Sequence, residues 1–415
     1  MPPDHMPAEH MPAERVDAAG DGVDIEAKPA GSAPTSSVRP IFEYWPALER
    51  SVGFLGLGDF PTPIERLDRL AVGAHGLAGE TYVKRDDLSS PVYGGNKVRT
   101  LEALFGQARR EGQHTIVATG AYGSNHSVAT VLHAHRVGFR SAVVLFPQPP
   151  SVTAAANLRV SVGLADEVTD LLHWSVLPFA IWQRERASRQ NRPGSLVMRP
   201  GGAVPRGCLG FMSAGLELAR QVDQGVMPAP DEVVIALGST CSTAGLLVGM
   251  RLAARLGIGW GRASGPNRGA GPLLLAVRVT PWPVTSPVRV LNLARAASAW
   301  LFQLSGRREF DLSRAELARH LVVDGSQLGR GYGQPTPAGL AAIDQLAPFS
   351  AALDTTYAAK SAAGLLARLG RGPAVRLFWS TKSAAPLPAV SEEALAQAPP
   401  RMRRWLERAL PSGAG

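Results

Sequence analysis

Short runs of strand-forming residues alternate with longer helical patterns along most of this chain, and the alternation limits its possible folds more than any other feature. Strands are predicted at 81–84, 115–118, 141–146, 195–198, 232–237, 273–279, 351–353 and 375–379. Helices are predicted at 97–111, 125–137, 153–162, 207–222, 243–256, 287–304, 313–321, 336–346 and 358–369. The pattern predicts an α/β protein whose parallel sheets are covered by helices on both faces.

The loop that follows the clearest strand has a composition suited to an anion. Parallel sheets bind ligands in the loops after the carboxyl ends of their strands. Here that loop reads Gly238-Ser239-Thr240-Cys241-Ser242-Thr243 and opens a predicted helix. Hydroxyl groups and backbone N–H groups at a helix start favour a phosphate, although an ordinary capped turn has a similar composition. The loop lacks the Gly-Lys-Ser/Thr ending of a Walker motif and the glycine spacing of a dinucleotide site.

Lysine is rare in this chain, which narrows the search for amine chemistry. Of 43 basic residues only five are lysine, namely Lys28, Lys84, Lys97, Lys360 and Lys382. Arginine stays charged, whereas a desolvated lysine can act as a neutral nucleophile. Lys97 follows Gly94-Gly95-Asn96 at a predicted helix start, with Asn96 expected as the N-cap. The alternative is a solvated lysine at a helix end.

Three polar residues lie in the strand-to-helix turn at 120–126, where the helix predicted at 125–137 begins. They are Ser124, Asn125 and His126. A Ser-His pair would suit a hydrolase, but residues two apart at a helix start diverge and the Gly-x-Ser-x-Gly elbow is missing. Asn125 could equally donate to a ligand oxygen. The structural alternatives are an N-cap and a histidine packed in the helix.

Two tyrosines are candidates for contact with a ligand. Tyr332 lies between Gly331 and Gly333, which lets the backbone bring its phenol close to a ligand, and Tyr357 precedes a predicted helix. A loop tyrosine without function is the alternative for each.

Composition excludes several classes of protein. No apolar run approaches the roughly 20 residues that span a bilayer, and no secretory signal is seen at the start, so no membrane partner and a cytoplasmic location are expected. Two cysteines, Cys208 and Cys241, cannot form a disulfide framework or a four-ligand zinc site. Residues 1–38 are expected to form a disordered tail, and 391–415 a C-terminal tail.

An arginine-rich stretch raises the question of nucleic acid. Residues 251–300 contain seven arginines and no acidic residue, in a chain of net charge +9. No nucleic-acid motif is present and aromatic residues do not interleave with the arginines. A solvated basic surface is therefore preferred, and no nucleic-acid partner is expected.

Several motifs occur together in one order, and with them the chain resembles a known family. It is similar to the fold-type-II pyridoxal-phosphate (PLP) enzymes, specifically the 1-aminocyclopropane-1-carboxylate (ACC) deaminase and D-cysteine desulfhydrase family. The landmarks, spread from Pro61 to about Thr381, are Pro61-Thr62-Pro63-Ile64-Glu65-Arg66-Leu67, Tyr82-Val83-Lys84-Arg85-Asp86-Asp87-Leu88, Gly94-Gly95-Asn96-Lys97, Ser124-Asn125-His126, Gly331-Tyr332-Gly333 and Asp354-Thr355-Thr356-Tyr357.

The resemblance implies an architecture like that of the tryptophan synthase β-subunit. Two open twisted, mostly parallel sheets would carry helices on both faces. A large PLP-binding domain would comprise 39–92 and 206–390, and a smaller substrate-side domain 93–205. A homodimer is expected on the same ground.

The resemblance also assigns roles to residues. Lys97 would form the Schiff base with PLP, and Asn125 would bond the phenolic oxygen of the cofactor. The loop from Gly238 through Ser239, Thr240, Cys241, Ser242 and Thr243 would hold the phosphate, and Thr381 would meet the pyridine nitrogen. Ser124 would face the substrate carboxylate, with Tyr332 and Tyr357 lining the substrate side.

The implied activity is that of a lyase or deaminase acting on a small amino acid. The favoured reaction is a D-cysteine desulfhydrase-like β-elimination that gives pyruvate, ammonia and sulfide. In it, Lys97 removes the Cα proton and the cofactor delocalises the carbanion. A neutral Thr381 beside the pyridine nitrogen suits elimination better than transamination.

Three departures from the family pattern keep alternatives open. The family has Tyr-Glu-Gly-Lys where this chain has Tyr357-Ala358-Ala359-Lys360, which counts against ACC deaminase. It has Ser-Gly-Gly-Thr where this chain has Ser239-Thr240-Cys241-Ser242, and Thr-Gly-Gly where this chain has Thr381-Lys382-Ser383. ACC deaminase and a PLP-binding homologue with little or no turnover therefore remain as alternatives.

Overall fold

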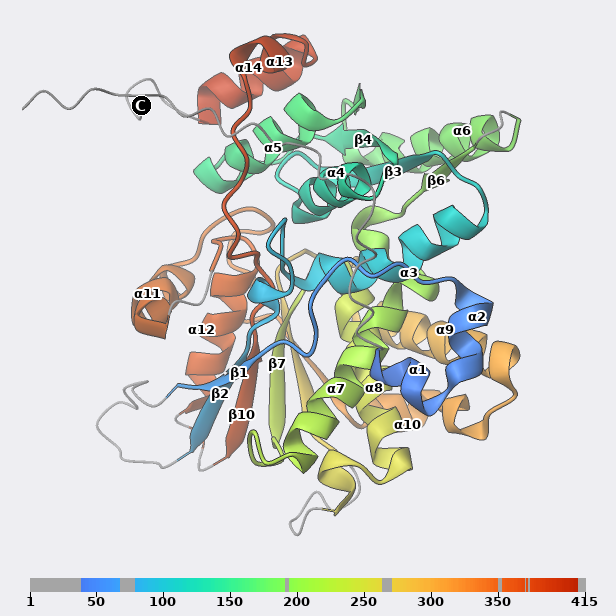
Figure 1. Ribbon diagram of the computed structural model, residues 1–415. Helices are drawn as coiled ribbons and strands as arrows, with labels where there is room; N and C mark the ends of the chain where they lie inside the picture. The colour runs from blue at the N-terminus through green and yellow to red at the C-terminus, as the bar shows by residue number, and fades with distance from the viewer. Residues whose placement is uncertain are drawn as a thin grey trace, which may run out of the picture. The chain divides into compact units, whose positions relative to one another are not determined.

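The computed structural model describes residues 39–67, 79–190, 194–262, 271–349, 353–369, 371 and 374–409. The expected N-terminal tail over 1–38, with Lys28, lies outside the described residues, as do the first two residues of the strand predicted at 351–353. Within 39–409 the chain forms two separate sheets with helices packed on them (Figure 1). The predicted α/β class with two mostly parallel sheets is confirmed.

The larger sheet has six strands in the order β1-β2-β10-β7-β8-β9. All neighbouring strands are parallel except β1, which pairs antiparallel with β2. The strands are β1 (Ile64–Arg66), β2 (Glu80–Lys84), β7 (Glu232–Leu237), β8 (Leu273–Arg278), β9 (Leu321–Asp324) and β10 (Val375–Trp379).

Successive side chains of the central strands pack alternately into two different hydrophobic cores. In β7, Val233 and Ile235 pack into the core with α7 and α8, whereas Val234 packs into the core with α11 and α12. A strand buried on both faces reads as a continuous apolar run, which is why these strands were predictable. The helices are α7 (Leu209–Asp223), α8 (Cys241–Leu256) and α9 (Pro287–Ser305) on one side and α11 (Pro337–Leu346) and α12 (Ala358–Leu369) on the other (Figure 1).

The smaller sheet has four parallel strands in the order β5-β4-β3-β6. They are β3 (Thr115–Ala121), β4 (Arg140–Phe146), β5 (Glu167–Asp170) and β6 (Ser195–Val197). One face packs on α3 (Asn96–Arg110), α4 (Asn125–Arg136) and α5 (Val152–Leu164), and the other on α6 (Leu177–Gln190). The register pairs Thr115 with Arg140 and runs to Ala121 opposite Phe146. The carboxyl ends of β3 and β4 therefore lie level with each other.

The C-terminal part differs from the expected tail. Residues 392–409 form α13 (Glu392–Ala396) and α14 (Pro400–Ala409), which pack against α5 (Figure 1). Met402 and Trp405 are buried, and the Trp405 indole donates to the carbonyl of Gln148 at 2.8 Å. The three-residue spacing of these side chains gives a short helix one apolar face, a signal hidden among many arginines and prolines.

The remaining differences concern short elements and one longer helix, α6. The predicted helix at 313–321 ends early, because α10 (Arg314–Ala318) is followed at once by strand β9. Strands β1, β5 and β9, with three or four residues each, were not predicted, and neither was α6. Two helices precede the larger sheet, α1 (Pro40–Tyr44) and α2 (Pro46–Val52).

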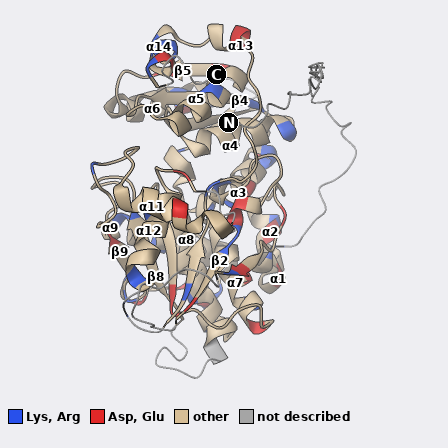
Figure 2. Ribbon diagram, turned by 90° about the vertical axis from the view of Figure 1, so that its left-hand side faces the viewer, with Lys and Arg blue, Asp and Glu red and all other residues tan. Residues whose placement is uncertain are grey.

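Part of the arginine-rich stretch is engaged in ion pairs. Arg255 of α8 lies 2.7 Å from the carboxylate of Glu316 on α10, and Arg251 lies 3.6 Å from it. Basic and acidic residues both occur around the larger sheet (Figure 2). Among the described helices, none has both the length and the apolar character needed to cross a bilayer.

Candidate active site

The start of α3 is fixed against the loop that follows β10. The Asn96 amide donates to the carbonyl of Thr381 at 3.2 Å, and a Cβ on Gly95 would lie only 2.6 Å from the same oxygen. The φ of Gly95 is +85°, a conformation that favours glycine. The N-cap is therefore Gly95 and not Asn96 as predicted. The Asn96 side chain instead donates to the Ser242 hydroxyl at 2.9 Å, which joins α3 to the β7–α8 loop.

Lys97 lies in the first turn of α3, surrounded by protein but with part of its surface accessible. Its Nζ is 3.5 Å from the carbonyl oxygen of Gly201, and no carboxylate of a described residue forms an ion pair with it. Burial lowers the pKa of the Lys97 ammonium below its usual value, with a smaller opposing effect from Cys241. The amine is therefore neutral more often at neutral pH than that of a solvated lysine, which favours a nucleophile.

Two consecutive glycines opposite Lys97 keep space free beside the amine. Gly201 has a φ of +66°, and a Cβ on it would lie 2.2 Å from the Ser239 hydroxyl oxygen and 3.4 Å from the Lys97 Nζ. Gly202 has a φ of +72° and lies against Thr100. The two glycines were not among the predicted site residues, because Pro200-Gly201-Gly202 has no motif that distinguishes it from an ordinary turn.

The β7–α8 loop contains a backbone conformation seldom found outside glycine. Thr240 has a φ of +74°, and it is the one non-glycine residue with a positive φ in the described parts of the chain. Such strain is concentrated at functional sites. The first amide groups of α8, beginning at Cys241, lack intrahelical acceptors and point out of the helix start. This set of free donors fits a phosphate group.

The side chain of Cys241 points away from that helix start. Its Sγ lies 3.1 Å from the Gly202 carbonyl and 4.0 Å from Sγ of Cys208, and both cysteines are fully buried. Contact with Cys241 together with burial raises the pKa of the Cys208 thiol. At this position the backbone amide, and not the thiol, is available to a ligand.

The start of α4 brings Ser124 and Asn125 into a hydrogen-bonded cluster. Ser124 is the N-cap, and its hydroxyl accepts from the Ser127 amide at 3.3 Å, so the capping alternative is confirmed. The Asn125 carbonyl oxygen accepts from Tyr93 at 3.1 Å and from Asn157 at 2.7 Å. Its amide donates to Asp354 Oδ2 at 3.0 Å and keeps a second N–H available.

His126 is packed inside the protein, as the structural alternative for it predicted. It is 2% exposed, and neither ring nitrogen has a hydrogen-bond partner among the described residues. Burial, assisted by the charge of Lys97, lowers the pKa of His126 to about 3. The imidazole is therefore neutral at physiological pH.

The side chains of the two tyrosines predicted to lie at the site, Tyr332 and Tyr357, are in direct contact. Their hydroxyl oxygens lie 2.5 Å apart and their rings pack edge to face. A Cβ on Gly238 would lie 3.0 Å from the ring of Tyr357, so this pair adjoins the β7–α8 loop. Burial raises the pKa of Tyr332 to about 12 and raises that of Tyr357 as well, so both phenols are protonated at neutral pH.

The other described lysines have separate environments. Lys84 is fully buried and binds Glu217 at 2.6 Å. Lys360 donates to the backbone carbonyls of Leu328 and Gly331 at 2.9 Å each, which supports the loop that carries Tyr332. Lys382 lies 3.1 Å from the Tyr93 hydroxyl. Among the described lysines, Lys97 is the one whose amine lies next to a glycine, Gly201, which has no side chain to fill the space beside it.

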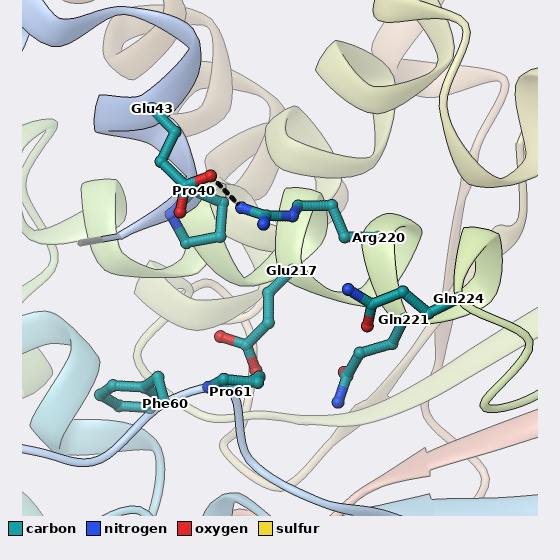
Figure 3. Close-up of a pocket in the computed structure, with 8 residues that line it drawn as sticks. All are labelled: Pro40, Glu43, Phe60, Pro61, Glu217, Arg220, Gln221 and Gln224. Atoms are coloured by element: carbon teal, nitrogen blue, oxygen red, sulfur yellow. Dashed lines mark hydrogen bonds and ion pairs between the residues drawn. The ribbon is translucent and has the colours of Figure 1, made fainter. Parts of the chain in front are cut away.

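A cavity of about 160 Å³ lies elsewhere, between α1, α7 and the turn at Phe60 (Figure 3). The Glu217 carboxylate at its wall is already paired with Lys84 and Arg99. None of the predicted site residues lines it. The described residues hold no group of three or more His, Cys, Asp or Glu side chains arranged for a metal ion.

Comparisons with known proteins show which family the chain is similar to. The profile of the family described as "Pyridoxal-phosphate dependent enzyme" matches residues 55–284. The nocardicin C-9' epimerase of Nocardia uniformis subsp. tsuyamanensis is 33% identical over 78% of this chain and 90% of its own length. The D-cysteine desulfhydrase of Salmonella paratyphi C is 32% identical over 74% of this chain and 85% of its own.

A solved structure extends the comparison. A crystal structure titled as an ACC deaminase homologue superposes with a TM-score of 0.65 at 25% identity, and it covers 84% of this chain and 96% of that one. The residues present fit the cofactor, because free helix amides, the glycine pair and a desolvated lysine amine adjoin one another. This chain therefore belongs to the fold-type-II pyridoxal-phosphate dependent enzymes, the group of D-cysteine desulfhydrase and ACC deaminase homologues, and its cofactor is pyridoxal 5'-phosphate.

Proposed function

We propose that this protein is a lyase that removes the β-substituent of a small D-amino acid, with D-cysteine as the favoured substrate. In balanced form, D-cysteine and one water give pyruvate, ammonia and hydrogen sulfide. The observation that supports this proposal is the desolvated amine of Lys97, which has no carboxylate partner among the described residues and lies beside Gly201. When bound, the cofactor supplies an aldehyde for this amine and a ring that accepts electrons from the substrate carbon.

The residues around Lys97 have distinct proposed tasks in holding the cofactor. The amides of 239–243, with Gly238 before them, would bind the phosphate. Asn125 would donate its second N–H to the phenolic oxygen while the first stays on Asp354. Thr381, a neutral residue, would lie at the pyridine nitrogen and would leave it unprotonated. These assignments follow the matching motifs of the family.

Proton transfer is assigned to three side chains. The Lys97 amine, whose pKa is lowered by burial, takes the Cα proton of the substrate. Tyr332 and Tyr357 share one short hydrogen bond and keep their protons at neutral pH, so the pair can donate a proton to a departing group. Ser124 at the start of α4 would orient the substrate carboxylate.

Epimerisation of an amino-acid centre is a second candidate. It is favoured by the similarity to nocardicin C-9' epimerase, which spans 90% of that enzyme. Removal of a proton on one face and its return on the other requires two proton carriers. Lys97 and the Tyr332–Tyr357 pair are separate groups that could serve in this way.

One experiment in deuterated water separates these functions. The PLP-loaded protein is incubated with D- and L-cysteine, D- and L-serine, and ACC, and keto acid, ammonia and chiral composition are measured. The proposal expects keto acid and ammonia from D-cysteine. Deuterium at Cα with inverted configuration and no keto acid supports the epimerase, and keto acid from ACC alone supports a deaminase. A yellow protein that changes no substrate contradicts all three.

A further inference from the structure

Lys382 is a second lysine whose charge is not matched inside the protein. It follows Thr381 in the loop after β10, and its side chain is largely enclosed. Its Nζ lies 3.1 Å from the Tyr93 hydroxyl and 5.2 Å from the centre of the Tyr93 ring. Within the described ranges no carboxylate lies at ion-pair distance from this ammonium. An enclosed cation of this kind is costly unless an anion joins it.

The acidic group that influences Lys382 electrostatically is engaged elsewhere. Asp354 raises the pKa of Lys382 from a distance, while burial lowers it more strongly. Asp354 Oδ1 accepts from the amides of Tyr357 at 2.5 Å and Ala358 at 3.1 Å, and Oδ2 accepts from Asn125. These bonds hold the carboxylate at the start of α12, so it stays a distant partner for Lys382.

Lys382 is nevertheless connected to the active site. Tyr93, which accepts from Lys382, donates in turn to the Asn125 side chain at 3.1 Å. A Cβ on Gly95 would lie 3.4 Å from the backbone carbon of Lys382, so the lysine begins directly behind the start of α3. The chain of contacts from Lys382 through Tyr93 and Asn125 to Asp354 ends at the Tyr332–Tyr357 pair.

We propose that Lys382 is a specificity-determining residue that binds an anionic group on the side chain of the amino-acid substrate. The inference rests on the proposed function, since it takes the site around Lys97 and Asn125 as the place where the amino acid binds. Ser124 is assigned to the α-carboxylate, which leaves the Lys382 ammonium for a second negative charge. A β-carboxylate or a cysteine thiolate has the required charge and length.

Binding of matched amino acids tests this assignment without turnover. The absorption spectrum of the PLP-loaded protein is titrated with D-aspartate and with D-asparagine, which have nearly the same shape but differ in charge. The wild type is expected to bind D-aspartate about 10- to 100-fold more tightly, the range typical of one hydrogen bond to a charged group. In Lys382→Met the ratio is expected to fall to about one, and in Lys382→Arg the preference is expected to remain.

Tyr93→Phe is the matched control, because it removes the hydrogen bond between Lys382 and the Tyr93 hydroxyl but keeps the aromatic ring and the charge of the lysine. Under the proposal this variant retains most of the preference for D-aspartate. Equal weakening of both ligands in Lys382→Met, an unchanged ratio, or loss of preference in Tyr93→Phe would overturn the proposal, since each marks a structural or α-carboxylate role. Failure of the proposed function is seen separately, as a PLP-loaded wild type that gives no keto acid or ammonia from D-cysteine.

Discussion

The backbone amide of Asn96 donates a hydrogen bond to the carbonyl oxygen of Thr381 at 3.2 Å, and this bond joins the helix that carries Lys97 to the loop after β10. The bond brings together two residues that are 285 positions apart in the sequence. The Asn96 side chain adds a bond to Ser242 in the β7–α8 loop. The backbone and the side chain of Asn96 thus fix the start of α3, and with it Lys97, to both loops that would contact the cofactor.

A buried ion network also holds α3. Arg99 binds Asp86 and Glu217 at 2.8 to 3.0 Å, and Lys84 binds Glu217 at 2.6 Å. Glu217→Ala is expected to lower the free energy of unfolding by about 3–5 kcal/mol, because it leaves two buried cations without their shared carboxylate. Chemical denaturation measures this. Glu43→Ala is the control, since its pair with Arg220 is partly exposed and such pairs contribute about 0–1 kcal/mol (Figure 3). Equal losses in both variants would contradict the network's role.

The Glu217 carboxylate also predicts that the stability of the fold depends on pH in the acidic range. Its cationic neighbours, against the opposing effect of burial, lower the pKa of Glu217 from 4.5 to about 2. A depressed carboxyl pKa stabilises the fold above the unfolded value, and this contribution is lost as pH falls from about 4.5 to about 2. Glu217→Gln is expected to flatten the stability profile in that window. A wild-type profile that the substitution leaves unchanged would speak against it.

His126 predicts a second loss of stability on acidification, which begins at a higher pH than the loss caused by Glu217. Its pKa falls from 6.5 to about 3 on folding, so the unfolded chain binds more protons between these values. Stability from the neutral imidazole is complete above pH 6.5 and declines as pH falls toward 3. His126→Gln is expected to reduce this slope and not to abolish it, because burial also lowers the pKa of His133, to about 4, and that of His320. The exposed His173→Gln should leave the slope unchanged. The melting temperatures of the wild type and the two variants are measured from pH 8 to pH 4. The same slope in His126→Gln as in the wild type would contradict the prediction.

Thr240→Gly is expected to stabilise the β7–α8 loop. The φ of +74° is strained for threonine and accessible to glycine, so relief of about 1 kcal/mol is expected, offset in part by the greater chain entropy of glycine. Thr243→Gly, within α8, should instead destabilise by about 1 kcal/mol. The melting temperatures of the two variants should move in opposite directions. A fall in both would contradict a strained Thr240.

The tyrosine pair should act in catalysis and not in cofactor binding. Tyr332→Phe and Tyr357→Phe each remove one hydroxyl of the 2.5 Å contact and keep the ring packing. A loss of about 10²- to 10⁴-fold in kcat is expected, the usual range for a proton donor. The PLP absorption band should stay as in the wild type. Loss of the band, or unchanged kcat in both variants, would remove the pair from the mechanism.

Much of the fold and of the site is visible in the sequence because the central strands are buried on both sides. β7 reads as an apolar run and β10 as one that only Arg376 interrupts, and loops at the ends of such strands are where ligands bind. The glycine pair Gly201-Gly202 was not predictable, because its importance lies in the approach of Ser239 and Lys97 from distant positions. The link between Lys382 and Tyr93 joins residues 289 positions apart and has no local pattern.

The helix at 400–409 was missed for a different reason. Its buried residues Met402 and Trp405 are separated by arginines, and their burial depends on the partner surface offered by α5 and Gln148. The strained φ of Thr240 was also not visible. A threonine by itself does not predict a positive φ, and tertiary contacts impose it here.

Lys97 is expected to carry the cofactor, and a labelling experiment can locate the lysine that does so. The protein is loaded with PLP and reduced with borohydride, which fixes the cofactor to the lysine that binds it, and peptide mass spectrometry then locates the label. A single labelled peptide that contains Lys97 is expected in the wild type, and no label is expected in Lys97→Ala. Label on Lys84, Lys360 or Lys382 in the wild type, or no label at all, would contradict it.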